Sequence, residues 1–183
     1  MKFIKRIALS SALVVTSFAA AADNDGLSEL ALKRANFSIE QAVEQVTNNY
    51  PGKITELKLD DHNHQAVYKI EIINEKEGIE QTLKYSTADG SLLKDERESL
   101  SVAGFSKLDE KDHVMLSQLD TTKFDLQASI NKIQKDYGSS VVELELENKK
   151  GITFYEVELL NDNELIIDVV TGEIVPLKRN YHG

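Results

Sequence analysis

Cysteine is absent from this 183-residue chain, and its absence limits how the fold can be stabilised. No disulfide can form, so the burial of apolar side chains has to stabilise the protein without covalent help. Zinc sites built from cysteine thiolates are excluded for the same reason. Long apolar runs are also lacking after the first twenty-two residues, so the sequence predicts no membrane-spanning segment there.

The short motifs that mark common active sites are missing as well. The sequence contains no glycine-rich phosphate loop, no HExxH and no Gly-x-Ser-x-Gly. Glu143, Glu145 and Glu147 look like paired carboxylates, but their alternation with apolar residues is typical of the solvated face of a strand. We therefore expect a protein that is not an enzyme and that uses no cofactor. An unrecognised hydrolase is the alternative that no residue pattern supports.

Positive charge is scarce, with 21 Lys and Arg against 31 Asp and Glu, a net charge of −10 at pH 7. Such a field repels nucleic-acid phosphates and anionic lipid surfaces, so we expect no nucleic-acid partner and no stable membrane insertion. The charge is compatible with basic protein partners or divalent cations. Solubility alone is the simpler explanation of it.

Residues 1–22 resemble a cleavable signal peptide. Lys2, Lys5 and Arg6 precede an apolar stretch, Ile7 to Phe18, and the run of alanines at 19–22 offers a cleavage site. Cleavage would remove three positive charges and leave a net charge of about −13. We expect export to the periplasm, with full secretion as the alternative.

The rest of the chain contains one small module twice. Residues 37–60 align with residues 124–147 without a gap, and the register then continues as far as Asn74 and Asn161. After a loop that is five residues shorter in the second copy, Asp89-Gly90 aligns with Thr171-Gly172. Identical residues recur at the same places: Phe37 and Phe124, Tyr50 and Tyr137, Tyr68 and Tyr155, Glu71 and Glu158.

Each copy changes from a helical pattern to a strand pattern. Apolar residues at +3, +4, +7 and +11 predict helices beginning at Ile39 and Leu126, capped by Ser38 and Asp125. Period-two alternation then predicts short antiparallel strands, at residues 54–59, 67–73, 79–86 and 91–93, and at 142–147, 155–159, 165–170 and 173–175. The fold class is therefore α+β, with each helix covering a small antiparallel sheet. We expect a first module at 23–97, a connecting segment at 98–123 and a second module at 124–183.

The second copy resembles a PepSY domain. The resemblance rests on Tyr155-Glu156-Val157-Glu158-Leu159, a polar turn, and then Asp168-Val169-Val170-Thr171-Gly172. The first copy is similar but has Ser86 in the place of the aspartate. The resemblance implies a cystatin-like arrangement in two tandem modules, a non-catalytic role, and the restraint of a peptidase or the binding of another envelope protein.

Candidate contact residues lie in the hairpin loops, because the helices and inner sheet faces are needed for the cores. These partner-binding candidates are Asp61, His62, His64, Asn74, Asn161, Asp162 and Asn163. The His62-x-His64 pair beside Asp60 and Asp61 could bind zinc, copper or nickel, but solvated side chains are the default in such a turn, so we predict no metal site. An envelope sensor or accessory protein that binds a cation or small ligand and modulates a signalling partner is the alternative function. Asp168 is expected to organise the Thr171-Gly172 turn that follows it.

Overall fold

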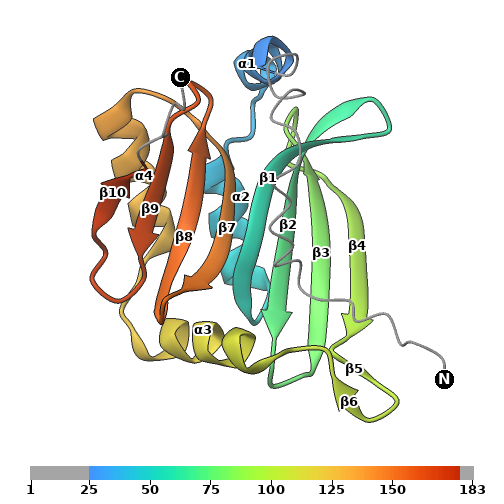
Figure 1. The fold of residues 1–183 in the computed structure, drawn as a ribbon. Helices are drawn as coiled ribbons and strands as arrows, with labels where there is room; N and C mark the ends of the chain where they lie inside the picture. The colour runs from blue at the N-terminus through green and yellow to red at the C-terminus, as the bar shows by residue number, and fades with distance from the viewer. Residues whose placement is uncertain (1–24, 178–183) are drawn as a thin grey trace, which may run out of the picture.

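The computed structural model describes residues 25–177, in which eight antiparallel strands form one sheet with helices against one of its faces (Figure 1). The predicted signal peptide lies outside the described residues. The strand order across the sheet is β10-β9-β8-β7-β1-β2-β3-β4. The strands of the first module are β1 Lys53–His62, β2 Gln65–Asn74, β3 Ile79–Ser86 and β4 Leu92–Ser99, and those of the second are β7 Val141–Lys149, β8 Ile152–Leu159, β9 Glu164–Asp168 and β10 Ile174–Pro176. None of the helices in this part of the chain is long and apolar enough to cross a membrane.

The two principal helices begin at the predicted caps. In α2 (Ile39–Asn49), Ser38 Oγ accepts from the Gln41 amide at 3.3 Å, and Gln41 Oε1 accepts from the Ser38 amide at 2.8 Å. In α4 (Leu126–Tyr137), Asp125 Oδ1 accepts from the Ala128 amide at 2.9 Å. These bonds satisfy backbone donors that a helix start otherwise leaves without partners. The predicted α+β modules, each with a helix on an antiparallel sheet, are confirmed.

The two modules join edge to edge through β1 and β7, which pair in antiparallel register. Leu57 lies opposite Leu144, its own counterpart in the repeat, and Glu56 and Lys58 lie opposite Glu145 and Glu143. Equivalent residues therefore meet at the centre of the seam, as they do at a two-fold axis between identical subunits. The repeat is arranged as a pseudo-symmetric pair.

Buried side chains from both modules form one continuous core beneath the sheet. Val43 and Val46 of α2 belong to the same cluster as Ile130 and Ile133 of α4. Across the seam, the buried Tyr155 hydroxyl donates to the carbonyl oxygen of Ile54 at 2.6 Å. The modules consequently share their interior as well as their sheet.

The remaining elements lie before the first module and between the two modules. Helix α1 (Asp25–Arg34) precedes α2, and a small hairpin of β5 (Ser101–Val102) and β6 (Phe105–Ser106) follows β4. Helix α3 (Glu110–Thr121) then crosses one end of the sheet (Figure 1). Its Leu116 packs in a second buried cluster with Ile73, Leu100 and Leu108. The connecting segment thus closes one end of the core.

Strand β4 is longer than the predicted 91–93 and extends past the expected boundary at residue 97. Its central residues, Lys94 to Glu98, are all charged. They show no apolar alternation, so the sequence pattern does not predict this part of the strand. Charged side chains are typical of edge strands, because they oppose pairing with another chain.

Candidate functional site

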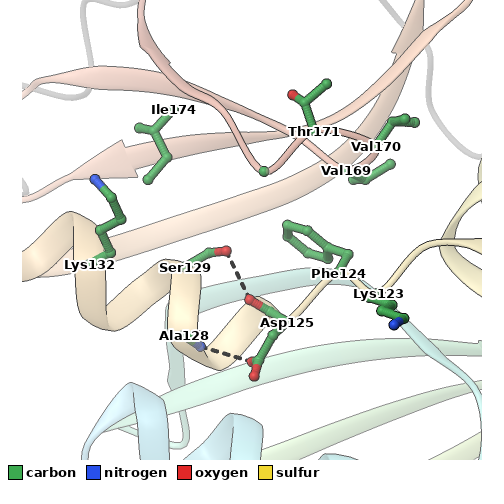
Figure 2. A pocket seen from close by; sticks show the side chains of 11 residues that line it. Lys123, Phe124, Asp125, Ala128, Ser129, Lys132, Val169, Val170, Thr171 and Ile174 are labelled. Carbon is green, nitrogen blue, oxygen red and sulfur yellow. Dashed lines mark hydrogen bonds between the residues drawn. The ribbon is translucent and has the colours of Figure 1, made fainter.

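A pocket of about 390 Å³ lies between the start of α4 and the turn that joins β9 to β10 (Figure 2). Its walls combine apolar groups from both elements with two lysines. The lining residues are Lys123, Phe124, Asp125, Ala128, Ser129, Lys132, Val169, Val170, Thr171, Gly172 and Ile174.

One wall of the pocket is the Thr171-Gly172 turn, which is drawn above the pocket in Figure 2. Asp168 Oδ1 accepts from the backbone amides of Val170 at 2.7 Å and Thr171 at 3.0 Å, which confirms the predicted role of this carboxylate. The Gly172 amide donates to the Asp168 carbonyl at 2.8 Å, with Gly172 at φ 71°. The carboxylate is therefore used to hold the turn and is not directed at a ligand.

The opposite wall is the first turn of α4 and the residue before its cap. Ser129 Oγ donates to the Asp125 carbonyl at 2.8 Å, so its hydroxyl is already used (Figure 2). The half-buried Phe124 ring stacks on Tyr155, with centroids 5.6 Å apart and planes inclined by 20°. That stacking holds the ring of Phe124 against β8.

The first module closes the equivalent place. A Cβ built on Gly90 would lie 2.6 Å from Cδ2 of Phe37, whereas a Cβ on Gly172 would meet nothing within 4 Å. The Asn36 and Phe37 amides both donate to the Thr87 carbonyl at 3.0 Å. The phenyl ring of Phe37 thus lies against its turn, while the corresponding space in the second module is open.

Carboxylates gather on the sheet face that carries neither α2 nor α4. Cross-strand pairing places Glu71, Glu56, Glu145 and Glu156 opposite one another in a row across β2, β1, β7 and β8. Lys69 pairs with Glu56 at 3.0 Å and with Glu71 at 2.6 Å, and Lys58 pairs with Glu56 at 2.7 Å, so two ammonium groups offset the two carboxylates in the first-module half of the row. Desolvation on this crowded face, and then repulsion from neighbouring carboxylates with Glu147 first, raise the pKa of Glu145 to about 7.

Of the predicted histidine pair, His62 is the last residue of β1, and His64 lies in the two-residue turn between β1 and β2. Asn63 and His64 have φ of 52° and 63°, and Asp61 Oδ1 accepts from the His64 amide at 3.4 Å. His62 Nε2 lies 3.3 Å from the side-chain nitrogen Nδ2 of Asn63. Within residues 25–177 no group of three His, Asp or Glu side chains could hold a metal ion. Partner binding by Asp61, His62 and His64 stays a prediction.

The other predicted contacts lie in two separate turns. Asn161, Asp162 and Asn163 are exposed between β8 and β9, at the same end of the sheet as the histidine turn (Figure 1). Asn74 lies at the opposite end, is buried, and its Oδ1 accepts from the Glu77 amide at 3.2 Å. The structure therefore does not bring the seven residues together, and the Asn74 side chain holds its own turn.

Sequence reasoning missed the pocket itself. The repeat accounts for Phe124, and the alternation predicts a strand that includes Val170, so neither residue is marked as part of a pocket. The available signal was the aligned pair Tyr85 and Ile167: the first module has an aromatic partner for Phe37 where the second has an aliphatic residue.

Comparison with known proteins agrees with the repeat. The sequence model of the PepSY family, described as "Peptidase propeptide and YPEB domain", matches residues 38–96 and 127–175. No curated protein matches the chain. A solved structure described as a lipoprotein from Clostridium difficile 630 is 21% identical, with 79% of this chain and 92% of that chain covered and a TM-score of 0.43. The two family matches span more than half of the sequence, and the chain belongs to the PepSY family.

Proposed function

We propose that this chain is a non-catalytic binding protein of the cell envelope that restrains or regulates a peptidase. The observation that carries the proposal is the double match to a domain named for peptidase propeptides. Propeptides act by occupying or holding their enzyme, so a binding surface is needed and a reaction centre is not. The proposed role rests on family membership, because a fold by itself does not specify which residues contact the partner.

The described side chains support a binding role. His113 Nδ1 lies 2.7 Å from a Glu75 carboxylate oxygen, on the exposed side of α3. Asp168, the acid of the family turn, is committed to backbone amides. The Asp168 carboxylate beside the pocket thus maintains the structure of the turn.

Two surfaces are available to a partner. One is the second-module pocket, and the other is the end of the sheet that carries the turns at Asp61–His64 and Asn161–Asn163. Exposed turns on a rigid sheet are common contact sites, because the sheet fixes their positions. We place the protein in the periplasm, or outside the cell, on the basis of residues 1–22.

The test is inhibition of peptidase activity. The purified chain would be titrated into envelope extract of its own source cells, with cleavage of fluorescent casein as the readout. The proposal predicts a saturable decrease in one peptidase activity, and co-purification of that enzyme with the tagged chain. Unchanged cleavage at all concentrations, with no peptidase retained, would contradict it.

A further inference from the structure

The repeat provides an internal comparison for the second-module pocket. In the first module the Phe37 ring lies under Gly90 and beside Tyr85, with ring centroids 6.0 Å apart. Phe124 is the counterpart of Phe37, but its ring stacks on Tyr155, one strand further from the edge of the sheet. The space under Gly172 that an aromatic ring would occupy by analogy is left open.

Backbone contacts show the same difference. Matching hydrogen bonds build the two turns: Gly90 to Ser86 at 2.9 Å and Gly172 to Asp168 at 2.8 Å. In the first module the lead-in to α2 is also bonded to its turn through the Thr87 carbonyl. The described residues of the second module contain no equivalent backbone bond between the lead-in to α4 and Val169. The second turn is therefore built like the first but is not closed by its own chain.

Two ammonium groups lie at the rim of the pocket in an acidic molecule. Lys123 is exposed at one side, and Lys132, on α4, reaches the other side, where it also pairs with Asp136 at 2.5 Å (Figure 2). The Asp125 carboxylate also lines the pocket, but it accepts from the Ala128 amide at the start of α4. Apolar walls beside the exposed Lys123 ammonium and the Lys132 ammonium favour a ring that is attached to, or followed by, a carboxylate.

We propose that this pocket binds an aromatic side chain of a protein partner, flanked by acidic residues, in the place that Phe37 fills in the first module. The inference rests on the proposed function, because it names the part of the partner that the site holds. The ligand that we expect is a polypeptide with Phe or Tyr next to Glu or Asp.

The experiment is an NMR titration of the purified chain with acetyl-Glu-Phe-Glu-amide, following backbone amides. Peaks of Val169, Thr171, Ala128 and Lys132 are expected to shift and to saturate at millimolar peptide. Acetyl-Glu-Ala-Glu-amide should bind about tenfold more weakly, because it lacks the side chain to be buried. Equal shifts with both peptides, or shifts confined to other regions, would overturn the inference.

Two variants of α4 distinguish a blocked pocket from a general loss of structure. Ala128→Phe places a ring in the pocket and should weaken the peptide at least tenfold, while Asn131→Phe adds the same ring on the exposed side of α4 and should leave binding unchanged. Lys132→Glu should reverse the charge preference and favour acetyl-Lys-Phe-Lys-amide. Equal binding by Ala128→Phe and the unmodified chain would overturn the inference.

The outcomes for the pocket and for the function are distinguishable. If peptidase inhibition occurs and Ala128→Phe inhibits as well as the unmodified chain, the pocket inference fails and the function stands. If the peptide binds the pocket but no peptidase is inhibited, the pocket stands and the function fails.

Discussion

Gly90 and Gly172 occupy equivalent turns with the same φ of 71° but have different surroundings. At either position the left-handed backbone conformation costs any residue with a Cβ about 1 kcal/mol of folding free energy. Only at Gly90 does a Cβ also collide with an aromatic ring, since Phe37 lies 2.6 Å away. The pair therefore separates backbone strain from the cost of displacing a neighbour.

Gly90→Ala should destabilise the protein more than Gly172→Ala. We expect a loss of about 1 kcal/mol for Gly172→Ala from backbone strain alone, and about 2–4 kcal/mol for Gly90→Ala, because the Phe37 ring must move. Urea unfolding followed by circular dichroism measures both values. Equal losses would show that Phe37 does not close the first turn.

Glu145 should make stability depend on pH. Its pKa of about 7 in the folded protein lies above the usual 4.5, so the folded state binds more protons between these values. The stabilising contribution of the protonated group is complete below pH 4.5 and is lost as pH rises through 7.

Glu145→Gln is therefore expected to be neutral at pH 4 and to stabilise the protein by about 1 kcal/mol at pH 8, a discounted value because solvent reaches this side chain. Glu44→Gln, on an exposed position of α2, is the control and should show no such dependence. A Glu145→Gln effect that is the same at both pH values would contradict the electrostatic explanation.

At the scale of elements, the seam between β1 and β7 decides the architecture. The register pairs only three residues of each strand, so the seam depends on the core beneath it and on the Tyr155 hydroxyl that reaches the Ile54 carbonyl. Tyr155 belongs to the family pattern of its own module, yet its hydrogen bond stabilises the junction with the other module.

Tyr155→Phe should weaken this junction. Removing the hydroxyl leaves a buried carbonyl without that donor, and we expect a loss of about 1–2 kcal/mol, a few degrees in Tm. Tyr137→Phe, at the end of α4, is the control. A Tyr155→Phe variant as stable as the parent chain would show that the hydrogen bond contributes nothing to the seam.

Some elements of this fold can be predicted from the sequence, and others cannot. The caps at Ser38 and Asp125 act locally, and the alternation in β8 reflects a sheet with one buried face, so these elements follow from short patterns. Strand β4 carries charges on both faces and lacks that signal. The β1–β7 seam and the open pocket depend on contacts between distant residues, which no local pattern contains.

At the scale of the whole molecule, the shared core predicts cooperative unfolding. Both helices and all of the central strands contribute to one cluster, so neither module can lose its structure without exposing the interior of the other. We expect urea to unfold the chain in a single transition, with far-ultraviolet circular dichroism and tyrosine fluorescence coinciding. Two separated transitions would show that the modules fold independently.

The pseudo-symmetric PepSY pair has one closed and one open turn, and we propose that the open turn binds a peptidase partner. Inhibition of envelope peptidase activity by the parent chain, by Ala128→Phe and by Asn131→Phe tests it most directly. We expect the parent chain and Asn131→Phe to inhibit casein cleavage equally, and Ala128→Phe to require at least a tenfold higher concentration. Absence of inhibition by the parent chain, or equal inhibition by all three, would contradict it.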